Sequence, residues 1–193
     1  MRSKKVFVLI ALSTIASLLI AAVNNFSLQM KIENFSLKDY NGKEHSLSDY
    51  KDSKAIVIIF IATECPISNA YNARMENIYK NYSQKNIAFI GINSNKEESV
   101  SRIKEHAEEK GLTFTILKDE KNIIADKFEA SFTPEAYILN NNFEILYHGR
   151  IDNSKNQSEV VSKDLENALN AILADKEVSK KETKAFGCTI KRI

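Results

Sequence analysis

The stretch AIVIIFIATECPISNAY, residues 55–71, places an apolar run of β-branched and aromatic residues shortly before a cysteine and a proline. Ala55 to Ala62 contains no polar residue, which is typical of a central strand covered on both faces. Pro66 suits the first position of a helix, where its missing N–H costs no hydrogen bond. The stretch therefore predicts a buried strand that turns into a helix at Cys65.

Strand and helix patterns alternate along the rest of the chain. The helix after Cys65 is expected to reach about Tyr82. Further strands are predicted at residues 86–93 and 113–117, further helices at 96–110, 123–128 and 160–173, and a late hairpin at 135–139 and 143–147. Asn41-Gly42, a dipeptide suited to a type I′ turn, predicts an early hairpin. This order indicates an α/β sandwich with a mostly parallel sheet, an antiparallel edge pair and helices on both faces.

The ends of two helices carry more specific signals. Asn95 followed by Glu98 has the spacing of a capping box, and Gly111 is a stop signal for the same helix. The last helix is expected to bury an apolar face. Its members are Val161, Leu165, Ala168, Leu169 and Ile172.

The N-terminus has the order of an export signal. Arg2, Lys4 and Lys5 precede the apolar stretch Val6 to Val23. Residues 1–25 are therefore interpreted as a signal peptide or an uncleaved membrane anchor, with the remainder on the extracytoplasmic side. A domain is expected at residues 30–175, followed by a charged tail at 176–193.

The amino-acid composition limits the kinds of ligand and partner that the chain is expected to bind. Lys and Arg number 27 against 25 Asp and Glu, without a basic stripe, so no nucleic-acid partner is predicted. His45, His106 and His148 show no metal-ligand spacing, and His106 is expected to be solvated on a helix surface. Neither a metal nor a cofactor is predicted.

Cys65 is the candidate nucleophile. At a helix N-terminus, unpaired N–H groups such as those near Ser68 favour thiolate over thiol, and such positions lower the pKa of cysteines. Glu64 opposes this effect unless its side chain points to solvent. The alternative is a free cysteine that acts as a small buried hydrophobic residue.

A second segment is expected near Cys65. Thr133-Pro134 precedes a predicted strand and should reach the same edge of the sheet. The residues alone favour a trans proline that starts an edge strand, with a cis bond as the alternative.

Five blocks of sequence together resemble the redoxin branch of the thioredoxin fold, which includes peroxiredoxin-like proteins and exported thiol-disulfide oxidoreductases. A sixth block, the last one named below, resembles the C-terminal block of one redoxin subgroup. The six blocks are FSLKDYNGKEHSLSDY, CPISNAYNARM, FIGINSN, SFTPEAYIL, YHGRID and ETKAFGCTIKR, within residues 32–193. The resemblance implies a thioredoxin-like three-layer sandwich with an N-terminal hairpin extension.

The resemblance also implies roles for individual residues. Cys65 matches the attacking cysteine, with Pro66 and Ser68 beside it. Thr133 and a cis Pro134 match the residues that line the site and hold an extended substrate backbone. The implied partners are a protein or small-molecule disulfide, or a peroxide, and a thiol electron donor.

The chain departs from the family pattern in two respects. Thioredoxins carry a second cysteine at the position of Ser68, and peroxiredoxins carry proline and a hydroxyl residue at the positions of Ile58 and Ala62. Cys188 is then expected to resolve the adduct on Cys65, to form a purely structural disulfide, or to be unpaired or intermolecular. The function is predicted as thiol-disulfide exchange, with a thiol-dependent peroxidase and a non-catalytic partner- or copper-binding module as alternatives.

Overall fold

The computed structural model describes residues 30–193. The predicted export segment, residues 1–25, lies outside the described residues. Between residues 30 and 193, no helix has both the length and the apolar composition needed to cross a membrane.

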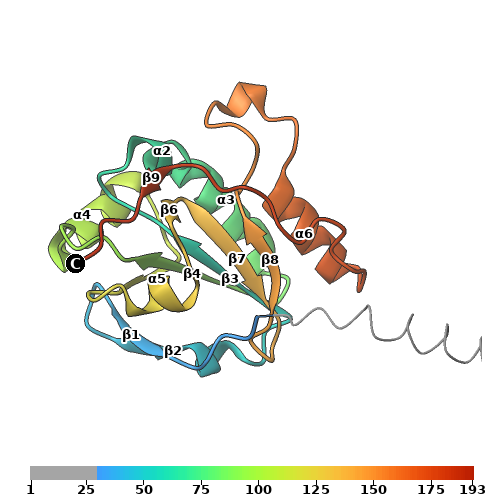
Figure 1. Cartoon of the computed structure of the whole chain (residues 1–193), viewed down its shortest axis with the longest axis horizontal. Helices are drawn as coiled ribbons and strands as arrows, with labels where there is room; N and C mark the ends of the chain where they lie inside the picture. Colours follow the sequence, from blue (N-terminus) through green and yellow to red (C-terminus); the bar gives the residue numbers. More distant parts are fainter. Residues whose placement is uncertain (1–29) are drawn as a thin grey trace, which may run out of the picture. The chain divides into compact units, whose positions relative to one another are not determined.

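A seven-stranded mixed sheet forms the centre of the molecule (Figure 1). In spatial order its strands are β2 (Glu44–Ser46), β1 (Ser36–Asp39), β5 (Thr115–Lys118), β4 (Ile87–Asn93), β3 (Ala55–Phe60), β7 (Glu135–Leu139) and β8 (Ile145–Gly149). Strands β3, β4 and β5 are parallel neighbours, whereas β1 and β7 run against their neighbours. All strands except β1 and β7 therefore point the same way, which confirms the mixed, mostly parallel sheet with an N-terminal hairpin.

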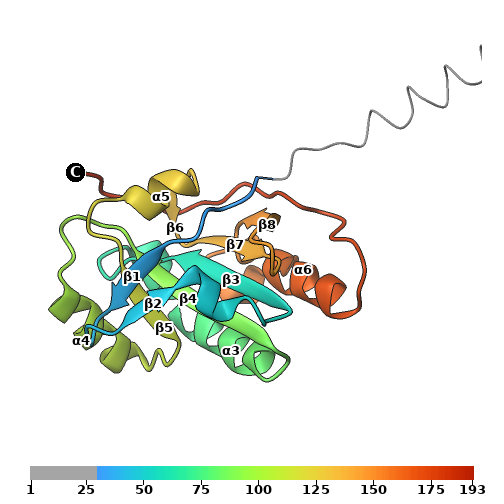
Figure 2. The same ribbon diagram turned by 90° about the horizontal axis from the view of Figure 1, so that it is seen from below.

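Helices cover both faces of this sheet and complete the predicted three-layer sandwich (Figures 1 and 2). One face carries α3 (Asn72–Ser83), α4 (Val100–Lys110) and α6 (Asp164–Leu173). The other carries α5 (Ile123–Lys127) and the 3-10 turn η1 (Leu47–Tyr50). The short α2 (Pro66–Ala70) and the 3-10 turn η2 (Gln157–Glu159) lie in connections.

Strand β3 separates two hydrophobic cores. Val57 and Ile59 belong to the core beneath α3, α4 and α6, whereas Ile56 and Ile58 belong to the core beneath α5. Successive side chains of a strand point to opposite faces, so a strand in contact with two cores needs apolar residues at every position. The uninterrupted apolar run of residues 55–60 therefore has a direct structural cause.

Residues 66–82 are predicted to form one helix, but they form two, α2 and α3. The chain leaves the α-helical path at Tyr71, whose N–H donates to the carbonyl oxygen of Ser68 at 2.9 Å. The Tyr71 hydroxyl donates to the buried carboxylate of Asp152 at 2.8 Å. That contact joins residues far apart in the sequence, and helical spacing does not reveal it.

Two helix starts are also corrected. Helix α4 begins at Val100 instead of residue 96, because Ser99 is its N-cap and accepts the N–H of Arg102 at 3.2 Å. The predicted Asn95–Glu98 capping box is therefore wrong. Helix α6 begins at Asp164, which leaves Val161 outside the helix and 89% exposed, although the rest of the predicted apolar face is buried.

The early hairpin is present, but its turn is not type I′. Gly42 has φ +83°, whereas Asn41 does not have a positive φ. The carboxylate of Asp39 accepts the N–H groups of Asn41 and Lys43, which supports a longer loop.

The C-terminal segment, residues 176–193, packs along the folded body (Figure 1). It contains β9 (Cys188–Thr189), which pairs antiparallel with β6 (Phe132–Thr133) in a separate two-stranded sheet. Sequence patterns did not predict either of these two-residue strands. The segment also contacts the loops that follow β4 and β5, at Asn95 and Asn122.

Candidate active site

Cys65 is the N-cap of α2, as the sequence predicts. Pro66 occupies the first helical turn, and the Ser68 N–H donates to the Cys65 sulfur at 3.3 Å. The hydroxyl oxygen of Ser68 accepts the N–H of Ala62 at 3.1 Å, which ties the start of the helix to the end of the strand before it. Cys65 is only 4% exposed, so its sulfur is held in a closed setting with one N–H directed at it.

Cys65 forms a disulfide with Cys188, across a sequence separation of 123 residues. The two Cα atoms are 5.9 Å apart, within the usual range for disulfides. Cys188 is only partly buried, whereas Cys65 is buried. Cys188 is therefore not unpaired in this structure. Two of the roles expected from the sequence remain for it: a resolving cysteine or one half of a purely structural disulfide.

Thr133 and Pro134 lie beside this disulfide, joined by a cis peptide bond, as the resemblance implies. The Thr133 carbonyl oxygen is 3.4 Å from the Cys65 sulfur. The Thr133 hydroxyl donates to the carbonyl oxygen of Cys188 at 3.4 Å. The fold thus brings the predicted residues from α2, β6 and the C-terminal segment to one point.

Glu98 holds the turn that leads to Cys65, a role that the sequence did not predict. Its buried carboxylate accepts the backbone N–H of Thr63 at 2.7 Å and that of Glu64 at 3.2 Å. It also accepts the side-chain N–H of Asn93 at 2.5 Å. Glu98 therefore joins the ends of β3 and β4 at the position where the chain turns toward Cys65.

Glu135 has the same function for the turn that contains Pro134. Its buried carboxylate accepts the N–H groups of Ser131 and Phe132, each at 2.8 Å. His148 Nε2 lies 2.6 Å from the other carboxylate oxygen, and the Tyr137 hydroxyl donates to that oxygen at 3.2 Å. Two buried carboxylates thus hold the two backbone segments that flank Cys65.

Comparison with known proteins identifies the family. The family described as AhpC/TSA matches residues 28–154. The chain belongs to this family. The matched region includes Cys65, Thr133 and Pro134 and ends before the C-terminal segment that carries Cys188.

Curated relatives of this AhpC/TSA-family chain carry several names. It is 36% identical over 107 residues to the thioredoxin-like protein YneN of Bacillus subtilis, covering 55% of this chain and 61% of the relative. It is 27% identical to the thiol-disulfide oxidoreductase ResA of Geobacillus kaustophilus, covering 58% and 63%. It is 26% identical to the chloroplastic peroxiredoxin Q of Sedum lineare, covering 66% and 72%. The chain therefore spans less than two thirds of the length of the first two relatives.

A solved structure resembles a larger part of the AhpC/TSA-family chain. A hypothetical protein from Sinorhizobium meliloti 1021 superposes with a TM-score of 0.80 at 28% identity, covering 86% of this chain and 94% of that protein. The similarity covers more of the chain than the family match to residues 28–154 does.

Other predictions about charged residues have mixed outcomes in this AhpC/TSA-family chain. The Glu64 side chain is 67% exposed and pairs with Arg102 at 3.1 Å, so it points away from the sulfur as required. His106 is buried beside Asn72, which corrects the solvated position predicted for it. Burial and the nearby Arg102 lower the pKa of His106. Among residues 30–193, no cluster of three or more His, Cys, Asp or Glu side chains is placed to hold a metal ion.

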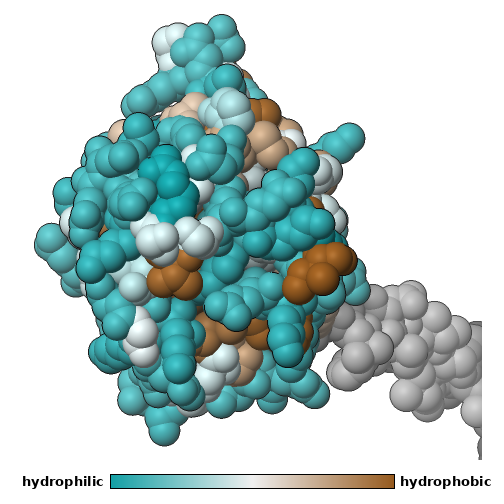
Figure 3. Space-filling view, turned by 90° about the vertical axis from the view of Figure 1, so that its left-hand side faces the viewer, coloured by the Kyte–Doolittle hydropathy of each residue, from teal (hydrophilic) through white to brown (hydrophobic). Residues whose placement is uncertain are grey.

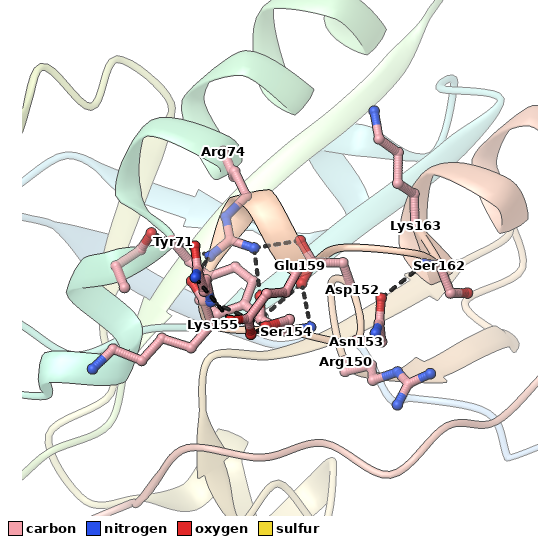
Figure 4. Close-up of polar contacts among 12 residues, drawn as sticks. Tyr71, Arg74, Arg150, Asp152, Asn153, Ser154, Lys155, Glu159, Ser162 and Lys163 are labelled. Carbon is pink, nitrogen blue, oxygen red and sulfur yellow. Dashed lines mark hydrogen bonds and ion pairs between the residues drawn. The ribbon is translucent and has the colours of Figure 1, made fainter.

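A buried ion pair fixes the helices after Cys65 to the loop after β8 (Figure 4). Arg74 Nη1 lies 2.5 Å from the Asp152 carboxylate and donates to the Ser154 carbonyl oxygen at 2.8 Å. Arg74 Nη2 donates to the Lys155 carbonyl oxygen at 2.6 Å. The guanidinium also lies 3.6 Å from the centre of the Tyr71 ring. This cluster holds the point at which α2 and α3 meet.

The residues missed by sequence reasoning had ambiguous signals. Glu98 has the spacing of a helix cap, and Glu135 begins an otherwise apolar strand, where an acidic residue is unusual. A charged residue in a buried strand needs buried partners, and that signal could have identified Glu135. For Glu98, no pattern separates a cap from a contact with residues 63 and 64.

We expect Glu98→Gln to destabilise the turn before Cys65. An amide nitrogen would face one of the N–H groups that the carboxylate now accepts, so one buried donor loses its partner, at about 1 to 3 kcal/mol. Urea unfolding monitored by circular dichroism measures the loss. Glu97→Gln removes the same charge from an exposed neighbour and should change stability by less than about 0.5 kcal/mol. Equal effects of the two substitutions would contradict the role of Glu98.

We expect Glu135 to make a pH-dependent contribution to the free energy of unfolding. Burial favours a raised pKa for Glu135, but the hydrogen bond from His148 and the N–H groups of Phe132 and Ser131 outweigh it, so the pKa is lowered. A carboxyl with a lowered folded-state pKa stabilises the protein above its unfolded pKa of about 4.3, and this contribution is lost as the pH falls through the folded value. Wild type should exceed Glu135→Gln in unfolding free energy at pH 7, and the difference should shrink below about pH 4. A constant difference from pH 3 to pH 7 would show that Glu135 does not titrate in this way.

Proposed function

We propose that this protein is a thiol-disulfide oxidoreductase in which Cys65 and Cys188 alternate between dithiol and disulfide. The main support is the disulfide between Cys65, an N-cap residue, and Cys188, the other cysteine of this AhpC/TSA-family chain. Curated relatives named thiol-disulfide oxidoreductases support this choice. The proposal concerns the described residues, since the chain spans only part of those relatives.

The chemistry consists of two exchange steps. In the reduced protein, the Cys65 thiolate attacks one sulfur of a substrate disulfide, and the other substrate sulfur leaves as a thiolate that takes a proton from water. The Cys188 thiolate then attacks the Cys65 sulfur of this adduct and releases the second substrate thiol. Two electrons pass from the protein to the substrate, and a thiol donor restores the dithiol.

The geometry supports separate tasks for the surrounding residues. The Ser68 N–H, held by the turn at Pro66, stabilises negative charge on the Cys65 sulfur. The same N–H stabilises Cys65 as a leaving group when a donor thiol attacks the more accessible Cys188. Thr133 and Pro134 present backbone to a substrate segment beside the sulfur.

Peroxide reduction is the second candidate, and the relative named peroxiredoxin Q favours it. In that reaction Cys65 would become a sulfenic acid, and Cys188 would condense with it to give the same disulfide and water. Ile58 lies in the hydrophobic core and Ala62 has no hydroxyl, so neither provides the polar peroxide contacts of a peroxiredoxin. These positions favour disulfide exchange.

A trapping experiment tests the proposed function. Reduced Cys188→Ser protein mixed with oxidised glutathione should accumulate a glutathione adduct on Cys65, detected by intact mass. Wild type should end instead as the Cys65–Cys188 disulfide. A Cys188→Ser protein that reacts with hydrogen peroxide but never with a disulfide would favour the peroxidase, and one that reacts with neither would exclude both reactions.

The reduction potential separates a catalytic bond from a structural one. Disulfides of thiol-disulfide oxidoreductases lie between about −120 and −270 mV, whereas structural disulfides lie below about −300 mV. Equilibration with dithiothreitol buffers, followed by alkylation and mass measurement, gives the potential. We expect a value in the higher range, and one below about −300 mV would indicate a structural bond.

We also propose that the domain acts on the extracytoplasmic side of a membrane, released or anchored. The support is the basic and then apolar order of residues 1–25. Fusing residues 1–30 to alkaline phosphatase lacking its own signal should yield active enzyme outside the cytoplasm of a bacterial host. Activity confined to the cytoplasm would contradict the proposal.

A further inference from the structure

Strand β9 occupies the edge of β6 directly beside Cys65. Thr133 pairs with Cys188 and Phe132 pairs with Thr189. The Thr133 carbonyl oxygen is at the same time 3.4 Å from the Cys65 sulfur. Cys65 is buried in this arrangement, so another polypeptide that reaches the sulfur along β6 must replace β9.

Gly187 sets a steric condition for this pairing. A Cβ atom at position 187 would overlap the Thr133 carbonyl oxygen and lie 2.7 Å from its carbonyl carbon. The φ of Gly187 is outside the left-handed region, so the close approach of the two backbones, and not an unusual conformation, requires glycine here. The residue that precedes the paired cysteine must therefore lack a side chain.

Ile190 sets a second condition, two residues after the cysteine. Its side chain is buried in the core beneath α5, and its N–H donates to the Ser131 carbonyl oxygen at 3.0 Å. Thr189, between Cys188 and Ile190, is exposed. The edge of β6 thus accepts an extended segment with the pattern glycine, cysteine, any residue, aliphatic residue.

Contacts outside this four-residue pattern hold the C-terminal segment in place. On one side the Thr183 N–H donates to the His148 carbonyl oxygen, and the His148 N–H donates to the Lys181 carbonyl oxygen, each at 2.9 Å. On the other side the Arg192 side chain binds the Asp126 carboxylate at 2.9 Å. Figure 3 shows the face around the left-hand end of Figure 1 as mainly hydrophilic, with small separate hydrophobic areas. That face therefore offers a partner no broad apolar interface.

The redoxin resemblance already implies that an extended substrate backbone lies beside Thr133 and Pro134; we propose that the edge of β6 selects the pattern Gly-Cys-x-aliphatic in that backbone, and that residues 187–190 are its tethered occupant. This rests on the proposed function and defines its substrate class as a polypeptide disulfide. The Cys65 thiolate attacks the sulfur of the docked cysteine, and a bond forms between these two sulfurs. The sulfur to which the docked cysteine was bonded leaves as a thiolate.

Full-length variants that lack Cys188 test the docking site. Cys188→Ser keeps the C-terminal segment docked, and adding Gly187→Val should displace it from β6. Adding Lys184→Val to Cys188→Ser is the matched control, because Lys184 is exposed in the same segment. The probes are the decapeptide KAFGCTIKRI and its valine counterpart KAFVCTIKRI, each bonded through cysteine to thionitrobenzoate. Released thionitrobenzoate gives the rate, and intact mass confirms the adduct on Cys65.

In the Cys188→Ser, Gly187→Val protein, the glycine peptide should react at least about tenfold faster than the valine peptide. The glycine peptide should react about tenfold more slowly with Cys188→Ser alone and with its Lys184→Val control. Equal rates for the two peptides would overturn the Gly-Cys pattern, and equal rates in all three proteins would overturn the tethered occupant. Circular dichroism melting curves confirm that each variant is folded.

The failure of this inference is distinct from failure of the proposed function. If Cys65 reacts with 5,5′-dithiobis(2-nitrobenzoate) in every variant but does not distinguish the peptides, only the docking site is wrong. If Cys65 in the folded, displaced variant reacts with neither the peptides nor this small disulfide, the proposed function is wrong as well.

Discussion

Replacing Cys65 with serine is expected to lower the rate of disulfide exchange at least about a thousandfold, because the reaction loses its nucleophile. Cys188→Ser is the matched control, since it removes the same disulfide but keeps the attacking sulfur. It should still perform the first exchange step once per molecule. The measurement is the rate of glutathione release from oxidised glutathione, followed by intact mass of the protein.

The comparison of these two variants also assigns the order of the cysteines. An active Cys65→Ser protein together with an inactive Cys188→Ser protein would reverse the roles proposed for them. Retained activity in both variants would mean that no cysteine of the chain carries the reaction. Melting curves of both variants should agree, since both lose the same cross-link.

The substitution Arg74→Met is expected to lower the free energy of unfolding by about 3 to 5 kcal/mol. It leaves the Asp152 carboxylate, only 5% exposed, without its cationic partner. The Ser154 and Lys155 carbonyl oxygens lose hydrogen-bond donors in the same change. Burial, with the Asp152 carboxylate beside it, raises the pKa of Tyr71, so its hydroxyl stays protonated and continues to donate to this carboxylate. This neutral donor does not replace the positive charge of Arg74.

Lys163→Met is the control for Arg74→Met. Lys163 is also a cation near the loop after β8, but its side chain is 65% exposed and, within residues 30–193, its ion pair is with Glu166 at 3.4 Å. Exposed pairs contribute about 0 to 1 kcal/mol, so this variant should be close to wild type. Guanidinium unfolding measures both. A loss of less than about 1 kcal/mol for Arg74→Met would show that the pair adds little beyond its own desolvation cost.

The central part of the fold was predictable because its signals are local. Residues 55–60 have no polar member, and a strand between two cores requires that composition. The N-cap position of Cys65 followed from Pro66, since proline has few favourable places in a helix. The helix starts at 96 and 160 were wrong because residues near them make contacts elsewhere. Glu98, for example, binds Thr63, and no helical spacing reveals that.

The sequence by itself determined the order of the main strands and helices along the chain and the helix-capping position of Cys65. Through its resemblance to redoxins, it also determined the cis bond before Pro134. Only the tertiary structure decided that Cys188 bonds to Cys65, because nothing local relates positions 123 residues apart. It also decided that Gly187 and β9 lie against Thr133, and that Glu98 and Glu135 hold the two turns. These contacts depend on backbone approach and burial, which arise when distant segments pack together, and a linear pattern does not record them.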